Sequence, residues 1–228
     1  MKTIGIIGGM SWESTAHYYA AINREVARRL GSLASAQILL HSLDFAPIAA
    51  MQDRGAWDEA GDLLADSAKR LEAAGADLLL LATNTMHLVA PAIEAAADIP
   101  LLHIADPTAD ALIADGATRV GLLGTRFTME MDFYTDRLRA AGLDPIVPDV
   151  DRTNLNAIIY EELCRGVVTE PSRAIYVRAI ERLAARGAQG VILGCTEIAM
   201  LINDDVSPLP VYDTTELHAR AAVDAALA

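Results

Sequence analysis

The stretch Val191–Glu197, which reads Val-Ile-Leu-Gly-Cys-Thr-Glu, decides how this chain is organised. Its apolar residues predict a buried strand, its glycine predicts a turn, and Cys195 then stands at the expected start of a helix. The earlier stretch Arg70–Thr85 aligns with Arg182–Glu197 without a gap, and Thr83 falls on Cys195 at an offset of 112 residues. We therefore expect an internal duplication in which Thr83 and Cys195 occupy equivalent positions.

A second pair of segments supports the duplication. The strand and glycine turn of Ile4–Gly9 recur at Arg119–Thr125, at the similar offset of 116 residues. Strands alternate with helices along the whole chain, which predicts mainly parallel sheets. The expected fold is α/β, with two pseudo-symmetric lobes that each hold a mainly parallel four-stranded sheet flanked by helices. Residues 1–104 and the C-terminal segment 213–228 form the first expected lobe, and residues 105–212 form the second.

The position of the active site follows from this expected fold. Ligands of parallel α/β sheets bind beyond the carboxyl ends of the strands. Two lobes related by a pseudo-twofold axis would face each other with those edges across a cleft. The active site is therefore expected in the inter-lobe cleft, with Thr83 and Cys195 approaching one ligand from opposite sides.

Composition limits the classes of function. The chain has 228 residues, of which 53% are apolar and 21% charged, as in ordinary soluble globular proteins. No apolar run is long enough for a membrane span, and no signal-peptide pattern follows Met1. A net charge of −13 argues against a nucleic-acid partner. Two cysteines are too few for a disulfide framework, so we expect a protein of the reducing cytoplasm.

Several helices can be placed from hydrophobic spacing. An amphipathic helix is expected over Trp57–Ala74, with single helices over Met86–Ala97 and Met129–Ala141 and a closing helix over Thr215–Leu227. Between Ile104 and Arg119 the pattern predicts no element.

Two side chains on opposite faces of one carbon are suited to inversion. One removes a proton from a stereocentre, and the other returns a proton to the opposite face. A proton α to a carboxylate is weakly acidic, so the base must be strong and hydrogen-bond donors must stabilise the developing enediolate. A thiolate meets this need, and we expect the helix start to lower the pKa of Cys195.

Three motifs together resemble the aspartate/glutamate racemase family: Ile4–Ser11, Thr83-Asn84-Thr85 and Gly194–Glu197. The resemblance spans essentially the whole chain. Leu40–Phe45, Leu123–Glu130 and Tyr160–Cys164 are also similar to the branch described as L-aspartate/glutamate-specific racemase. The resemblance implies a homodimer of two-lobed subunits that acts on a small amino-acid substrate and needs neither pyridoxal phosphate nor a metal.

The resemblance also implies the site residues. Cys195 would deprotonate the L-enantiomer, and Thr83 would serve the other face. Small polar side chains at both half-sites are suited to holding carboxylate oxygens. The expected substrate-binding set is Met10, Ser11, Gln52, Asn84, Thr85, Thr125, Thr128, Thr196 and Glu197, of which Met10 and Gln52 enter through the resemblance. For each of Asn84, Thr85, Thr125, Thr128 and Thr196 taken singly, plain helix capping is an equally compatible role. Glu197 is either a hydrogen-bond acceptor or a base that acts through a residue that contacts the substrate.

Two residues depart from the family pattern. Most members have cysteine in both half-sites, whereas the first half-site here has Thr83, whose hydroxyl is no free base at neutral pH. We therefore expect slow turnover, with different rates for the L- and D-enantiomers. Aspartate racemases with paired cysteines often have a lysine where this chain has Cys164, which we interpret as a structural residue.

Other readings stay open. The spacing of Gly5, Gly8 and Gly9 does not fit a dinucleotide loop, and the histidines show no metal-ligand spacing. His87 is close to Thr83 in sequence, so a role in the site and a capping or core role are equally compatible. A single cysteine also fits an arylmalonate-type decarboxylase, although only 5% of residues are aromatic. A third reading is an impaired protein that only binds amino acids.

Overall fold

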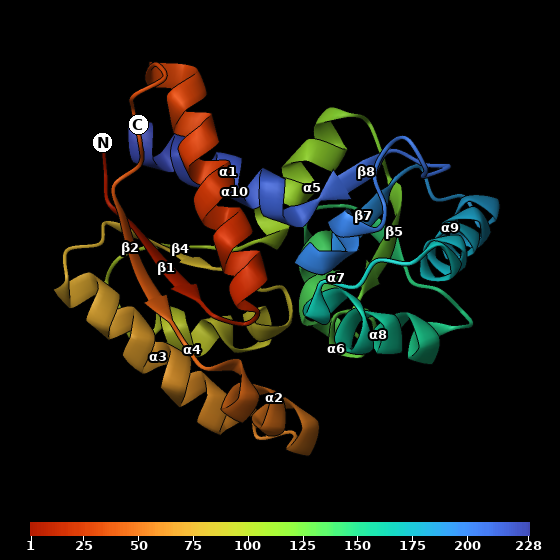
Figure 1. Ribbon diagram of the computed structural model, residues 1–228, viewed down its shortest axis with the longest axis horizontal. Helices are drawn as coiled ribbons and strands as arrows, with labels where there is room; N and C mark the ends of the chain where they lie inside the picture. The colour runs from red at the N-terminus through yellow and green to blue at the C-terminus, as the bar shows by residue number, and fades with distance from the viewer. The chain divides into compact units, whose positions relative to one another are not determined.

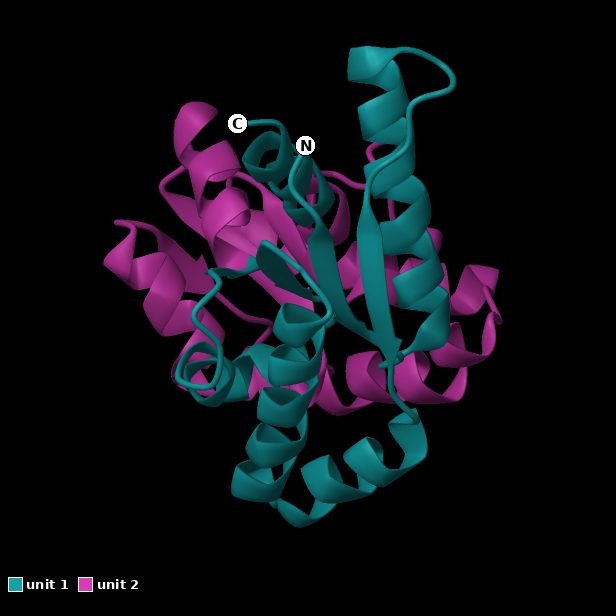
Figure 2. Cartoon of the chain, turned by 90° about the vertical axis from the view of Figure 1, so that its left-hand side faces the viewer, with its two compact units in different colours: residues 1–104, 218–228 teal, residues 105–217 magenta.

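The computed structural model describes residues 1–228 and divides the chain into two compact units. Unit 1 comprises residues 1–104 and 218–228, and unit 2 comprises residues 105–217, coloured teal and magenta in Figure 2. The first lobe was expected to resume at residue 213, which is the last residue of the strand Val211–Asp213. In the structure, unit 1 resumes at residue 218. No helix combines the length and the apolar character that crossing a bilayer requires.

Each unit is built on one parallel sheet of four strands (Figure 1). The order in unit 1 is β2-β1-β3-β4, and the order in unit 2 is β6-β5-β7-β8. The strands of unit 1 are β1 (Ile4–Gly8), β2 (Ile38–Ser42), β3 (Leu78–Leu81) and β4 (Leu101–Leu102). Those of unit 2 are β5 (Arg119–Gly124), β6 (Asp144–Ile146), β7 (Val191–Gly194) and β8 (Val211–Asp213). The α/β fold with two parallel four-stranded sheets is therefore confirmed.

Helices cover both faces of each sheet. In unit 1 these are α1 (Trp12–Leu30), α2 (Phe45–Arg54), α3 (Trp57–Ala73), the 3₁₀ helix η1 (Thr85–Val89) and α4 (Ala90–Glu94). In unit 2 they are α5 (Ala105–Ala114), α6 (Arg126–Glu130), α7 (Asp132–Ala140), α8 (Arg152–Glu161), the 3₁₀ helices η2 (Leu163–Arg165) and η3 (Thr196–Met200), and α9 (Glu170–Ala185). The last helix, α10 (Thr214–Leu227), begins in unit 2 and continues into unit 1.

Side-chain alternation along the strands places many of the helices on one face or the other of their sheet. In unit 1, Ile4 and Ile6 of β1 belong to an apolar cluster with residues of α1 and α10. Ile7 belongs to a second cluster, formed with α2, α3 and α4. In unit 2, α8, α9 and η3 pack on the face of Leu193, and the buried cluster there includes Cys195.

The turn between helix and strand repeats in detail. Gly75 and Gly187 both have a positive φ, and their amides donate to the residue three positions back, each at 2.9 Å. The side chain two residues further on then binds the start of the neighbouring strand. The amide of Thr3 donates to Asp77 at 2.6 Å, and the amide of Thr118 donates to Gln189 at 2.7 Å. The repeated hydrogen bonds support the duplication expected from the sequence.

Three expectations about helices were wrong. The single helix expected over Met86–Ala97 is divided into η1 and α4, because Pro91 has no N–H to continue the ladder and its ring would clash with the preceding turn. The helix expected over Met129–Ala141 is divided into α6 and α7 at Met131, whose backbone is extended. Helix α5 fills a segment where no element was expected.

Candidate active site

Two neighbouring strands of unit 2 end together at the position of the thiol. Gly124 of β5 pairs with Gly194 of β7, so Thr125 and Cys195 leave the sheet side by side. A Cβ on Gly194 would lie 2.9 Å from the carbonyl oxygen of Leu123, and a Cβ on Gly124 would lie 2.9 Å from that of Gly194. Glycine at both positions therefore lets the two strand ends approach closely.

The thiol of Cys195 has a carboxylate partner. Its side chain is 8% exposed, and its Sγ donates to Oε2 of Glu197 at 3.0 Å. The hydroxyl of Thr196 donates to the same oxygen at 2.7 Å, which holds the carboxylate in place. Glu197 is itself buried. The arrangement gives the thiol proton a defined acceptor.

The expected lowering of the thiol pKa is wrong. Burial raises the pKa of Cys195 well above its ordinary value, and the negative charge of Glu197 raises that pKa further. Cys195 precedes a five-residue 3₁₀ helix and not an α-helix, so little helix dipole is available to oppose these effects. The thiol is therefore protonated in the resting protein at neutral pH.

Hydroxyl groups surround the end of β5. Thr125 caps α6, and its Oγ1 accepts a hydrogen bond from the amide of Thr128 at 3.3 Å. The two hydroxyl oxygens are also 3.3 Å apart. Both residues are buried, whereas Thr196 on η3 is partly exposed. The expected site residues of unit 2 thus gather around the ends of β5 and β7.

In unit 1, Thr83 stands where Cys195 stands in unit 2. It follows β3 and is 9% exposed, and its amide donates to the carbonyl of Leu81 at 2.9 Å. Ser14, near the start of α1, donates from Oγ to the carbonyl of Ala82 at 3.4 Å. His87 on η1 has its Nδ1 2.8 Å from the carbonyl oxygen of Thr83. The loop after β3 is therefore held from two sides.

The other expected residues of unit 1 lie at the same sheet edge, because β1 and β3 are neighbours. Ser11 caps α1. The preceding Gly9 has a φ of 94°, and a Cβ there would lie 2.1 Å from the carbonyl oxygen of Leu43. The side-chain nitrogen of Gln52 donates to Sδ of Met86 at 3.0 Å. The remaining members, all buried, are Met10, Asn84 and Thr85.

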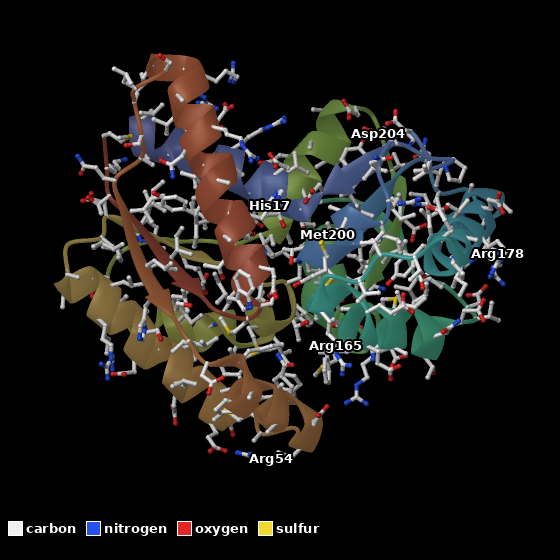
Figure 3. All side chains as sticks on the ribbon, viewed as in Figure 1. His17, Arg54, Arg165, Arg178, Met200 and Asp204 are labelled. Atoms are coloured by element: carbon white, nitrogen blue, oxygen red, sulfur yellow. The ribbon has the colours of Figure 1, made fainter.

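Cys164 lies on η2, which packs against η3, and its side chain contacts the same apolar cluster that contains Cys195. Arg165 and Met200, labelled in Figure 3, mark the ends of these two 3₁₀ helices. Cys164 is partly buried, and neither cysteine forms a disulfide. The sequence did not reveal that the segments of the two cysteines are neighbours.

A surface pocket in unit 2 does not involve the expected site residues. Its volume is about 340 Å³, and it is lined by Pro148, Asp149, Val150, Arg182, Leu183, Ala185 and Arg186. The lining residues of α9 precede the turn that leads into the amino end of β7, whereas Cys195 follows its carboxyl end. No group of three or more His, Cys, Asp or Glu side chains is arranged to hold a metal ion.

Comparison with known proteins identifies the family. Residues 7–222 match the family model Asp/Glu/Hydantoin racemase. The broad specificity amino-acid racemase RacX of Bacillus subtilis is 24% identical over 99% of this chain and 98% of its own length. An arylmalonate decarboxylase structure, at 19% identity and a TM-score of 0.52, shares the fold alone.

Two of the similar solved structures align with this chain over the full length of both proteins. A Yersinia pestis protein described as a candidate Asp/Glu racemase is 52% identical with a TM-score of 0.93. An aspartate racemase homologue from Pyrococcus horikoshii is 35% identical with a TM-score of 0.86. The chain belongs to the Asp/Glu/hydantoin racemase family.

Proposed function

We propose that this protein is an amino-acid racemase that acts on aspartate or glutamate without pyridoxal phosphate. Cys195 removes the Cα proton of the L-enantiomer, and Thr83 serves the opposite face of the same carbon. The observation that carries the proposal is the buried hydrogen bond from the Cys195 thiol to Glu197, at the strand end that the repeat matches with Thr83. Relatives named as amino-acid racemases support it.

Glu197 generates the base. The thiol is neutral at rest, so a thiolate forms when its proton passes to Oε2 of Glu197. The positively charged ammonium group of a bound amino acid would favour that thiolate by Coulomb attraction. The thiolate then takes the Cα proton, and the electron pair left on Cα delocalises into the substrate carboxylate as an enediolate.

Hydrogen-bond donors near the strand ends stabilise the enediolate. Thr125 supplies a hydroxyl group beside Cys195, and Asn84 and Thr85 supply side chains beside Thr83. The hydroxyl of Thr196 is released to donate to the substrate when Oε2 of Glu197 takes the thiol proton. Donors that are already fixed when charge develops lower the barrier most. Met10, Ser11, Gln52 and Thr128 complete the proposed pocket.

The Thr83 side returns the proton. The hydroxyl of Thr83 donates its proton to the carbanion and takes another from solvent. Glu197 releases to solvent the proton that it took from the thiol, which restores the resting state. The pKa of a threonine hydroxyl is too high for it to act as a free base near pH 7. Removal of the Cα proton from the D-enantiomer should therefore be the slower direction. The equilibrium ratio of the enantiomers stays at unity in achiral solvent, so the bias is kinetic.

Two further properties are part of the proposal. Cys164 supplies no positive charge where aspartate racemases with paired cysteines often have lysine. The side-chain carboxylate of the substrate is then held by neutral donors, and the substrate range extends beyond aspartate. The enzyme works as a homodimer in the cytoplasm. Light scattering during size-exclusion chromatography would test whether it is a dimer.

The direct test is proton NMR of each L-amino acid with enzyme in deuterated water. We expect loss of the Cα proton signal for L-aspartate or L-glutamate, no loss with Cys195→Ala, and loss at the wild-type rate with the matched control Cys164→Ala. Thr83→Cys should increase exchange of the D-enantiomer. Exchange that survives in Cys195→Ala would overturn the assignment of the base.

A single thiol in place of two also favours one alternative, an arylmalonate-type decarboxylase, in which the thiol only protonates a carbanion left by departing carbon dioxide. Release of carbon dioxide from a phenyl-substituted malonate, without Cα exchange of amino acids, would establish it. Tight binding of L-aspartate without exchange would instead establish a binding protein.

A further inference from the structure

The ring of His87 lies between two parts of the unit 1 backbone. Its Nδ1 is 2.8 Å from the carbonyl oxygen of Thr83, and its Nε2 is 3.2 Å from the amide nitrogen of Ile104. Thr83 follows β3, and Ile104 is the last residue before the chain enters unit 2. One buried side chain therefore connects the Thr83 loop with the last residue of the first segment of unit 1.

The two contacts determine the protonation state of this ring. A carbonyl oxygen only accepts hydrogen bonds, so Nδ1 carries a hydrogen. A backbone amide only donates, so Nε2 presents its lone pair. Both contacts require the neutral imidazole protonated at Nδ1. A ring flipped or protonated at Nε2 would bring two hydrogens together at Ile104.

Neighbouring rings restrict rotation of His87. The ring centroid of His103 is 4.5 Å away and that of His218 is 6.0 Å away, both in edge-to-face arrangements. His218 is fixed in turn, because its Nε2 is 2.8 Å from the carbonyl oxygen of Leu102 and its Nδ1 is 2.8 Å from the hydroxyl of Tyr18. His87 is thus held by packing as well as by hydrogen bonds.

These contacts fix the backbone of Thr83 at both ends. Its amide donates to Leu81, and its carbonyl accepts from the ring of His87. The backbone amide of His87 donates to the carbonyl of Asn84 at 3.1 Å. The carbonyl of Thr83 therefore accepts its hydrogen bond from the His87 ring and not from the backbone amide of His87. With both peptide groups fixed, the direction of the Cα–Cβ bond, and with it the range of the hydroxyl, is fixed.

We propose that His87 is a positioning residue for the Thr83 half-site, which it orients through the Thr83 carbonyl. The inference rests on the proposed racemase function, because it assumes that the Thr83 hydroxyl returns a proton to the substrate. It predicts that loss of the Nδ1 donor impairs inversion more than it impairs proton removal by Cys195.

Two substitutions separate the two contacts of the ring. Asparagine places an N–H donor where Nδ1 lies and lacks an atom at Nε2. Glutamine places an acceptor oxygen where Nε2 lies and lacks the donor at Nδ1. His87→Asn therefore keeps the bond to Thr83, and His87→Gln keeps the bond to Ile104.

The experiment follows L-aspartate in deuterated water and measures the D-enantiomer formed relative to the deuterium gained by recovered L-enantiomer. The expected ratio falls about tenfold in His87→Gln, as the loss of one hydrogen bond in the inverting step implies, and stays near the wild-type value in His87→Asn. Equal ratios in both variants would overturn the inference. No exchange by the wild-type protein would instead overturn the racemase function on which the inference rests.

A second measurement uses the unaltered protein and does not depend on how the variants fold. Long-range ¹⁵N–¹H correlation spectra of the histidine rings distinguish the two neutral tautomers. We expect His87 in the Nδ1–H form at neutral pH, with and without L-aspartate. A ring protonated at Nε2 would contradict the contact with Thr83 and overturn the proposal.

Discussion

Cys195 and Thr83 occupy matching positions but have different neighbours. The thiol donates to a carboxylate that can take its proton, whereas the backbone of Thr83 is held by an imidazole that is already committed to two hydrogen bonds. In the proposed racemase, the first arrangement would serve proton removal and the second would present a hydroxyl in a fixed direction. This difference accounts for an expected kinetic bias between the two enantiomers.

Replacing Glu197 by glutamine should separate its effect on thiol acidity from its effect on catalysis. Without the carboxylate charge the pKa of Cys195 falls, although burial keeps it above the ordinary thiol value. The rate of Cα exchange nevertheless falls about 100-fold, because glutamine cannot accept the thiol proton. The thiol pKa is measured from the pH dependence of alkylation in a Cys164→Ala background.

The pH profile of the wild-type enzyme provides the control. Transfer of the thiol proton to Glu197 releases no proton to solvent, so kcat/KM for L-aspartate should be flat near neutral pH and increase further only as pH rises through the raised pKa of the thiol, above about pH 8.5. In Glu197→Gln, which lacks the internal acceptor, the flat region should disappear and the rise should begin at lower pH. Alkylation showing that the wild-type thiol ionises below pH 8 would contradict the raised pKa.

For single residues, the sequence predicted which positions form the candidate site but not their protonation or hydrogen bonds. Alignment of the repeat selected Thr83 and Cys195 without any structure. The direction of the thiol pKa could not be obtained that way, because it depends on burial and on the side chain of Glu197 turning back toward Cys195. The spacing of four residues between Thr83 and His87 is compatible with a hydrogen bond between them. The same spacing is equally compatible with a core role for His87, so the sequence alone did not predict the bond.

Among the elements, the short helix α6 shows how capping and site geometry coincide. Thr125 caps it next to Cys195, and Thr169 caps α9 with the same kind of bond, accepting from the amide of Ser172 at 3.2 Å. Thr125→Ala and Thr169→Ala should each lower the free energy of unfolding by about 1 kcal/mol, measured by urea denaturation. Only Thr125→Ala should also slow Cα exchange, and an equal slowing in both variants would mean that the effect is one of stability.

Regular elements were the most predictable part of the fold. The turns at Gly75 and Gly187 and the strands that follow them were visible in the sequence, because aliphatic runs after glycine have few alternative structures. Helix α5 was missed for a physical reason. Its buried residues have helical spacing, but they are mostly small: Ala105, Thr108, Ala109 and Leu112. Small side chains contribute little apolar contrast between the two faces of a helix.

For the whole molecule, the decisive feature is that unit 1 is assembled from two separate segments of chain. Residues of α10 pack with β1, β3 and α1 in one apolar cluster, and Ala222 in that cluster is fully buried. The amide of Lys2 also donates to the carbonyl of Ala226 at 2.8 Å. Unit 1 therefore depends on the segment that follows unit 2.

Ala222→Glu should destabilise unit 1 selectively. An unpaired buried carboxylate costs about 3 kcal/mol or more, whereas the matched change Arg220→Glu lies at an exposed position of the same helix and should cost less than about 0.5 kcal/mol. Amide hydrogen exchange is the measurement, and β1 and β3 should lose protection before β5 and β7. Simultaneous loss from all four strands would show that the two units unfold as one.

The two-segment construction of unit 1 also bears on biosynthesis. Domains of most proteins fold in the order in which the ribosome makes them. Here the ribosome finishes all of residues 105–217 before it makes residues 218–228, which complete the apolar cluster of unit 1. The half of the protein that is translated first is thus the last to close its core, and until then the apolar faces of α1 and β1 that α10 covers stay open to solvent.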